Sequence, residues 1–234
     1  MMIRLLSAGA AMGVVHALTP RFREALDAEI DATFGAVGAM KALLDAGSPC
    51  DAIVLTQSMI DALATDRRVL ADTIAPLGRV QTAIAVRDGD VLPDVSDARR
   101  LRSALEAAGA LYFPDPERAT AGIHFISVLR TLGIDTAVRD KLRPFANGAT
   151  AMRTLAEQGR YGDIGCTQMT EIVYTSGVTP VAALPDGLGL ATTYTAAVTR
   201  AAEDVDGARR FVALLTGDET RELRARGGFE QPKS

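Results

Sequence analysis

The sequence has no tryptophan, 5% aromatic residues, two histidines and two cysteines in 234 residues. So few histidines argue against a multi-histidine metal site, and so few aromatic residues disfavour a surface that stacks sugars or bases. Cys50 and Cys166 cannot form a disulfide framework, and no activating base lies near either of them in the sequence, so we expect packed free thiols. The sequence predicts neither a resident metal ion nor a cofactor.

The chain also has no excess of positive charge. Its net charge is −4 and its isoelectric point is about 5.3, which disfavours a nucleic-acid partner. No apolar run reaches the roughly 18–20 residues of a membrane span, so no membrane insertion is expected. A composition that is 48% hydrophobic and 23% charged is enough to bury a core. We therefore expect a globular chain of one or two domains.

The first 18 residues have the outline of a secretory signal, with Arg4, an apolar stretch and small residues near Ala17. We interpret them instead as a strand over residues 3–6 followed by a helix over 10–27, kinked or broken at Pro20. Removing the segment would delete the first strand of the predicted fold. We therefore expect a cytoplasmic protein, with a periplasmic location as the alternative.

Short apolar runs alternate along the chain with segments of helical periodicity, which is typical of an α/β fold with parallel strands. Strands are expected at residues 3–6, 30–34, 52–55, 80–86, 110–113, 141–146, 163–167, 178–184 and 190–199. Helices are expected at residues 10–27, 38–46, 57–64, 97–107, 121–132, 149–158, 168–175, 205–215 and 218–226.

Two of the apolar runs, residues 80–86 and 190–199, are suited to cross between two lobes. We expect two α/β lobes, each with its own sheet, joined by these crossing strands. Lobe 1 comprises residues 1–82 and 189–234, and lobe 2 comprises residues 83–188.

Ligands of open α/β sheets bind outside the carboxyl ends of the strands. Several expected strands here lead through a small or glycine-rich turn straight into a helix, whose free N–H groups and positive end suit an anion. The alternative is that the glycines only permit tight turns and that these residues only cap helices. The expected ligand-binding residues are Ala10, Val37, Gln57, Ser58, Thr120, Thr150 and Gln168.

The order of the elements resembles that of the molybdate-type periplasmic substrate-binding proteins, which are type II solute-binding proteins, over about residues 3–229. The segments that carry the resemblance are Ser7-Ala8-Gly9-Ala10, Gly47-Ser48-Pro49-Cys50-Asp51, Thr120-Ala121-Gly122, Asn147-Gly148-Ala149-Thr150, Tyr161-Gly162-Asp163-Ile164-Gly165 and Gly227-Gly228-Phe229. The resemblance implies a two-lobed fold with two crossing hinge strands. It also implies a protein that closes on a small anion, with an ABC permease as partner if the chain is exported.

The resemblance further implies hydroxyl groups that hold the oxyanion, and these are absent here. The family's two serines and one tyrosine correspond to Ala10, Val37 and Gln168. A desolvated oxyanion left without donors costs several kcal/mol. We therefore expect a small organic carboxylate in place of molybdate, with Arg118 or Arg153 as a further clamp.

Two other functions remain open at this stage. An isomerase on the same scaffold, similar to aconitate isomerase, would move a proton on a small polycarboxylate and would need a base, for which His124 and Glu171 are the candidates. A ligand-sensing domain without a transporter is the third possibility, and the sequence does not separate it from the first.

Overall fold

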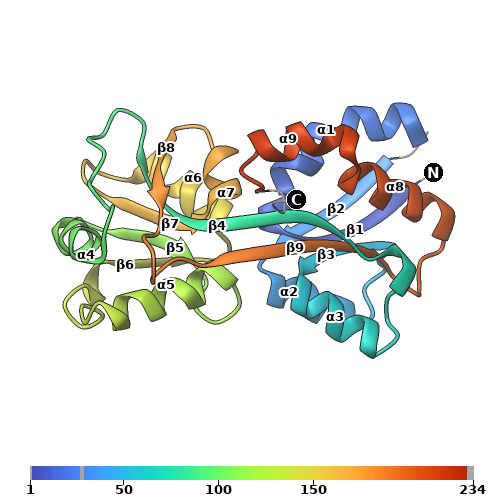
Figure 1. Ribbon diagram of the computed structural model, residues 1–234, viewed down its shortest axis with the longest axis horizontal. Coiled ribbons are helices and arrows are strands. Elements are labelled where there is room, and N and C mark those ends of the chain that lie inside the picture. The colour runs from blue at the N-terminus through green and yellow to red at the C-terminus, as the bar shows by residue number, and fades with distance from the viewer. Residues whose placement is uncertain (1, 27–28, 231–234) are drawn as a thin grey trace. The chain divides into compact units, whose positions relative to one another are not determined.

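The computed structural model describes residues 2–26 and 29–230, and the chain forms two compact units. Unit 1 consists of Met1–Val80 and Thr192–Ser234, and unit 2 consists of Gln81–Ala191. The chain passes from one unit to the other along two strands, β4 (Ala75–Arg87) and β9 (Ala191–Val198) (Figure 1).

The sheet of unit 1 is built on three parallel strands, β1 (Met2–Ala8), β2 (Glu29–Gly35) and β3 (Ala52–Thr56). β1 lies between the other two, and β9 pairs antiparallel with β3. Ala8 is in register with Gly35, and Ser7 with Val54, so the three parallel strands end at one edge. The expectation that residues 3–6 form a strand of this sheet is confirmed.

The helices of unit 1 are α1 (Met12–Leu26), α2 (Val37–Asp45), α3 (Gln57–Thr65), α8 (Val205–Thr216) and α9 (Arg221–Arg226). α1 packs on α8 through the rings of Phe22 and Phe211, whose centroids are 4.8 Å apart. α1 does not end at Pro20, so the expected break is wrong. Leu18 and Phe22 are fully buried on either side of Pro20, and this burial offsets a proline cost of about 3 kcal/mol.

A buried carboxylate joins three segments of unit 1. The Asp51 side chain, 1% exposed, accepts hydrogen bonds from the backbone, Nε and Nη2 of Arg4 and from the backbone N–H of Glu203, each at 2.9 Å. Burial acts to raise the pKa of Asp51, but the hydrogen bonds from Arg4 and Glu203 outweigh burial and hold the pKa below its usual value. The ionised side chain therefore ties β1, the start of β3 and the segment before α8 together.

Unit 2 has three parallel strands, β5 (Leu111–Pro114), β6 (Leu142–Phe145) and β7 (Ile164–Gln168), with β5 in the middle. β4 pairs antiparallel with β7 and with β8 (Val178–Ala183). The helices are α4 (Ala98–Ala107), α5 (Thr120–Thr131), α6 (Gly148–Gln158) and α7 (Met169–Val173).

Unit 2 has two hydrophobic clusters, one on each face of its sheet. Ile84 and Val86 belong to a cluster with residues of α4 and α5, whereas Ala83 and Ala85 belong to a cluster with residues of α6 and α7. Successive residues of a strand point to opposite faces, so β4 contributes to both clusters. The sheet therefore lies between two helical layers.

The strands are linked by hydrogen bonds in the order β2-β1-β3-β9-β4-β7-β5-β6, with β8 beside β4. β4 and β9 are neighbours in this order, so one continuous sheet runs through both units. The expectation that each lobe has its own sheet is therefore wrong. The two crossing strands satisfy backbone groups that would otherwise be unpaired; within unit 2, for example, the N–H of Thr82 donates to the carbonyl of Leu190 at 2.9 Å. No helix of the described ranges is long and apolar enough to cross a membrane.

Replacing Asp51 by asparagine tests the carboxylate that joins three segments of unit 1. We expect Asp51→Asn to lower the free energy of unfolding near neutral pH by about 2–3 kcal/mol, because the Arg4 guanidinium loses its charged partner. The folded pKa of Asp51 is depressed, so the wild type should lose this stability as the pH falls below about 4, and the variant should lack that loss. Urea unfolding from pH 3 to 7 measures both effects. Asp66→Asn, at an exposed aspartate of unit 1, is the control, and equal curves for Asp51→Asn and Asp66→Asn would contradict the assignment.

Candidate functional site

At the edge of unit 1 where β1, β2 and β3 end, the helices start without side-chain caps. The helical turn at Gly9–Ala11, α2 and α3 start there at Ala8, Ala36 and Thr56, and none of these three residues caps its helix with a side chain. In contrast, α4 and α8 start with Asp97 and Asp204, whose carboxylates accept from the first turn. The first N–H groups of a helix have no partner within the helix, so where no side chain caps them they can receive an anionic group.

The predicted site residues of unit 1 lie at this edge with different capacities. Ala10 and Val37 are apolar and only 3% and 5% exposed. The amide of Gln57 is engaged, because its Nε2 donates to Asp61 at 2.7 Å and its Oε1 accepts from Thr195 at 2.6 Å. Ser58 is exposed, with its hydroxyl 3.3 Å from that of Thr56. This edge can therefore offer a ligand mainly apolar contacts and backbone N–H groups.

In unit 2 the corresponding position is Gln168, the last residue of β7 and the residue before α7. Its side chain is 2% exposed, and neither its Nε2 nor its Oε1 has a hydrogen-bond partner in the described part of the chain. Buried amides are almost always hydrogen-bonded, and each unsatisfied group costs about 1–3 kcal/mol. Among residues 2–26 and 29–230, nothing pairs with the amide of Gln168, which leaves one donor and one acceptor unused.

Three buried threonine hydroxyls share this condition, and sequence reasoning missed them. The Oγ1 atoms of Thr82, Thr170 and Thr192 are buried without a partner among residues 2–26 and 29–230. Thr82 is the register partner of Gln168 across the antiparallel pair of β4 and β7, so both side chains lie on one face of the sheet. The available signal was a threonine inside an otherwise apolar crossing strand.

Glu171 is buried beside Gln168 but is fully engaged. Its carboxylate accepts the hydroxyl of Thr167 at 2.5 Å. It also accepts the backbone N–H groups of Gly148, Ala149 and Gln168. Burial raises the pKa of Glu171, and these hydrogen bonds reduce that rise without cancelling it.

The carboxylate of Glu171 thus occupies the start of α6. The remaining first-turn donor, the N–H of Thr150, is taken by the Asn147 side chain at 2.8 Å. A Cβ on Gly148 would lie 1.9 Å from Oε2 of Glu171, so only glycine fits there. Thr150 therefore starts a helix whose end is already occupied by the Glu171 carboxyl group, and a ligand would find fewer free donors there than the sequence suggests.

α5 has a more open start. Thr120 is its first residue, half-buried, and Ala119 before it provides no side-chain cap. His124, one turn further on, has its Nε2 2.8 Å from the carbonyl of Leu188, so Nε2 carries the proton in that bond. Arg118 and Arg153, which were expected to help hold the ligand, are both exposed.

The thiols behave as the sequence predicts. Both are buried, and burial raises the pKa of Cys50 to about 12 and raises that of Cys166 as well. Neither is an activated nucleophile. In the described residues no group of histidine, cysteine, aspartate and glutamate side chains could hold a metal ion.

Comparison with known families places the chain. The profile of a family described as bacterial extracellular solute-binding protein matches residues 3–230. The chain belongs to this family of solute-binding proteins.

Solved structures show the same fold at low sequence identity. The periplasmic molybdate-binding protein of Azotobacter vinelandii matches with a TM-score of 0.81 and 15% identity, over 99% of this chain and all (100%) of that one. The sulfate-binding protein of Mycobacterium tuberculosis matches with a TM-score of 0.77 and 18% identity, over 100% of this chain and 88% of that one. The two-lobed periplasmic-binding-protein fold expected from the sequence is confirmed.

An enzyme is also among the relatives. Aconitate isomerase from a Pseudomonas species is 24% identical over 219 residues, covering 91% of this chain and 81% of the isomerase.

The buried carboxyl group of Glu171 should make the free energy of unfolding depend on pH. Because the folded pKa lies above the usual value of about 4.3, the wild type should be most stable below that pH and should lose stability as the pH rises through the folded pKa. We expect Glu171→Gln to remove this loss, and Glu171→Ala to cost about 3 kcal/mol by leaving buried donors unpaired. Urea unfolding at pH 5 and pH 8 tests this, with the exposed Glu157→Gln on α6 as control. A wild type that gains stability over that range would contradict it.

Proposed function

We propose that the chain is a solute-binding protein for a small organic carboxylate that carries a hydroxyl or protonated carboxyl group, and that it does not bind molybdate tightly. The observation that carries the proposal is the buried amide of Gln168, whose two polar atoms both lack a partner in the described residues. The proposal holds that this amide meets the ligand, with the hydroxyl of Thr82 beside it.

The chemistry of an amide favours such a ligand over a simple oxyanion. Nε2 of Gln168 can donate to a carboxylate oxygen, but Oε1 can only accept and needs a donor. Fully ionised molybdate or sulfate has acceptors only, so Oε1 would stay buried and unpaired at a cost of about 1–3 kcal/mol. A hydroxy acid brings an acceptor and a donor in one molecule.

The residues of unit 1 support the same choice. Buried Ala10 and Val37 stand where the resemblance implies serines, so they offer carbon surface in place of hydroxyl donors. The uncapped starts of α2 and α3 supply N–H groups for one carboxylate. We propose Ala10, Val37 and Ser58 as the ligand-contacting residues of unit 1, and Thr120 and Gln168 as those of unit 2.

A ligand panel tests the proposal. We expect malate or citrate to raise the melting temperature more than succinate, which lacks the hydroxyl, and molybdate to have no effect at micromolar concentration. Gln168→Leu should weaken binding of the best carboxylate about tenfold or more, and Thr82→Val about fivefold. Thr131→Val, on the exposed side of α5, is the control. Tight molybdate binding by calorimetry, or unchanged affinity in Gln168→Leu, would refute the proposal.

An isomerase similar to aconitate isomerase is the second candidate, favoured by the identity to that enzyme over most of the chain. The two candidate bases have partners, since His124 is bonded to the Leu188 carbonyl and Glu171 to α6. We therefore expect no conversion of trans-aconitate to cis-aconitate, and no exchange of its carbon-bound protons when the protein is incubated with it in D2O, followed by proton NMR. Turnover that His124→Gln or Glu171→Gln abolishes, with ligand binding intact, would establish the enzyme instead.

The family supports a proposal for the location and the partner. The family is described as extracellular, which supports the periplasmic alternative and gives no support to the cytoplasmic expectation. One structural relative is the substrate-binding domain of a putative molybdenum ABC transporter from Clostridium difficile, at a TM-score of 0.70 and 16% identity over 99% of both chains. We propose that this chain acts outside the cytoplasm and that an ABC permease is its partner.

A further inference from the structure

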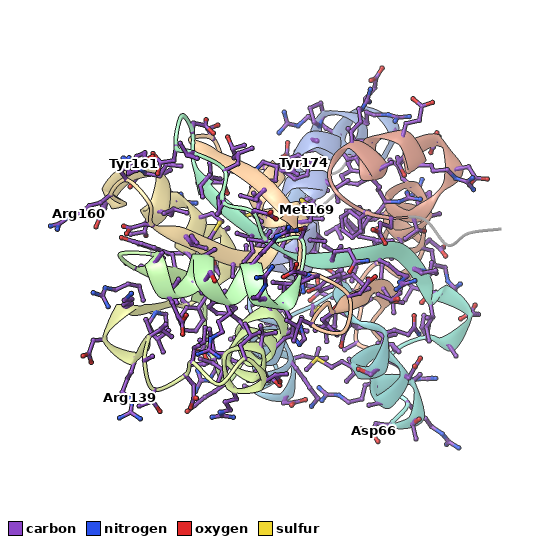
Figure 2. All side chains as sticks on the ribbon, turned by 60° about the vertical axis from the view of Figure 1, so that its left-hand side comes forward. Asp66, Arg139, Arg160, Tyr161, Met169 and Tyr174 are labelled. Atoms are coloured by element: carbon purple, nitrogen blue, oxygen red, sulfur yellow. The ribbon has the colours of Figure 1, made fainter. Side chains whose placement is uncertain are left out.

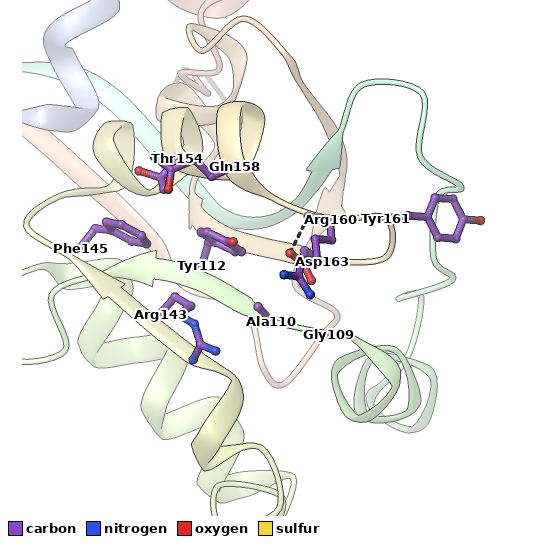
Figure 3. Close-up of a pocket in the computed structure, with 10 residues that line it drawn as sticks. All are labelled: Gly109, Ala110, Tyr112, Arg143, Phe145, Thr154, Gln158, Arg160, Tyr161 and Asp163. Carbon is purple, nitrogen blue, oxygen red and sulfur yellow. Dashed lines mark hydrogen bonds between the residues drawn. The ribbon is translucent and has the colours of Figure 1, made fainter.

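Unit 2 contains a pocket that lies away from Gln168. Its volume is about 540 Å³, and Tyr112, Arg143, Phe145, Thr154, Arg160 and Asp163 are among the residues that line it (Figure 3). The pocket lies where β5 and β7 begin, whereas Gln168 ends β7. Figure 2 shows Arg160 and Tyr161 projecting at the far end of unit 2 from Met169, the residue that follows Gln168.

Strand geometry brings the lining together. Tyr112 of β5 is in register with Arg143 of β6, and Phe145 is two residues further along β6, so the three side chains lie on one face of the sheet. This is the face that α6 covers, since Tyr112 packs in the cluster with Met152 and Leu155. β6 is the last strand of the sheet, which leaves the pocket open at this edge.

Stacked rings form an apolar surface inside the pocket. The rings of Tyr112 and Phe145 are nearly parallel, with an interplanar angle of 6° and centroids 5.8 Å apart. Thr154 and Gln158 of α6 line the opposite side, and Tyr161 points away from the others (Figure 3). A flat apolar group of a ligand can lie along this surface.

Two guanidinium groups at the pocket have no carboxylate partner within the described ranges. Arg143 uses Nη1 for the carbonyls of Asp140 and Leu142, at 2.8 and 2.9 Å, which leaves its other donors unused. Arg160 shows no side-chain hydrogen bond or ion pair, whereas Arg68 and Arg102 each hold a carboxylate.

The two guanidinium groups act on the same phenol. Burial raises the pKa of Tyr112, as do the charge of Asp163 and a hydrogen bond to its carboxylate, whereas the charges of Arg143 and Arg160 lower it. Because Asp163 already takes the Tyr112 hydroxyl, a ligand's anion would interact with the exposed guanidinium groups of Arg143 and Arg160, which line the same pocket.

The loop that carries Arg160 is braced. The Asp163 carboxylate, buried, accepts the backbone N–H of Arg160 at 2.8 Å, and the N–H of Asp163 donates to the carbonyl of Arg160 at 3.1 Å. The N–H of Gly162 also donates to Asp90 at 3.3 Å. A Cβ on Gly109 would lie 2.7 Å from Asp163 Oδ1, so glycine makes room for this carboxylate. A braced loop lowers the entropic cost of binding.

We propose that this pocket is a second binding site of the protein, which takes a small monoanion with a planar apolar body. The carboxylate of such a ligand lies between Arg143 and Arg160, and its ring lies on Tyr112 and Phe145. Asp163 offsets one of the two positive charges, so the pocket favours one negative charge over two. The site does not depend on the strand-end residues around Gln168.

Benzoate is the probe, added to the full chain and followed by two-dimensional ¹H–¹⁵N NMR. We expect saturable shifts of the backbone amides of Gly109, Arg160 and Gly162. Arg160→Gln and Arg143→Gln should each weaken the apparent affinity about fivefold or more, since each removes a charge-assisted hydrogen bond. Both residues are exposed, so the variants should fold, and their spectra report this directly. Arg139→Gln, at another exposed arginine of unit 2, should bind as the wild type does.

Two further arms locate the probe. Gln168→Leu should leave benzoate binding unchanged, and inorganic phosphate should compete only weakly because it lacks the apolar ring. Shifts confined to the residues around Gln168, equal affinities in the Arg139 and Arg160 variants, or the absence of saturation would each overturn the proposal.

Discussion

The strand-end edge of unit 2, where β7 leads into α7 beside the start of α6, depends on one buried carboxyl group. Glu171 extends from α7 to the start of α6 and binds the N–H groups of Gly148 and Ala149. Without it, two donors at a buried helix start would lack partners. Its position also explains the glycine at residue 148, because a Cβ there would collide with the Glu171 carboxyl group. The carboxyl group also fills the start of α6 from inside the protein, a position that would otherwise suit an anionic group.

The two units consequently offer different chemistry. In unit 1 the helices at the strand ends start without side-chain caps, and the neighbouring side chains of Ala10 and Val37 are apolar. In unit 2 the helix end of α6 is filled, and the unpaired groups in its described residues include the neutral amide of Gln168 and the hydroxyl of Thr82, its register partner. Backbone donors suit a carboxylate, and a neutral amide suits a group that both donates and accepts.

β7 also connects two distinct polar environments. Its carboxyl end leads to Gln168 and Glu171, whereas the loop before it carries Arg160 and Asp163. The strand itself is entirely buried, with Gly165 giving room for Met152 and Leu155 of α6. α6 has its start bound to Glu171 and its last two turns, through Thr154 and Gln158, along the pocket. One rigid helix therefore contacts both places.

The sequence alone determined the order and position of the elements, because alternating strand and helix periodicity is a local property of the chain. The strands expected at residues 52–55 and 163–167 appear as β3 and β7 with ends within one residue. The same periodicity marked the strand ends, and with them Gln168 as the residue at the carboxyl end of β7. Three features required the tertiary structure. The pairing of β4 with β9, the engagement of Glu171 with α6 and the placement of Tyr112, Arg143 and Arg160 in one pocket all join segments far apart in sequence. A buried polar group is paired or unpaired according to the residues that folding places next to it. Residue type and spacing do not contain that information.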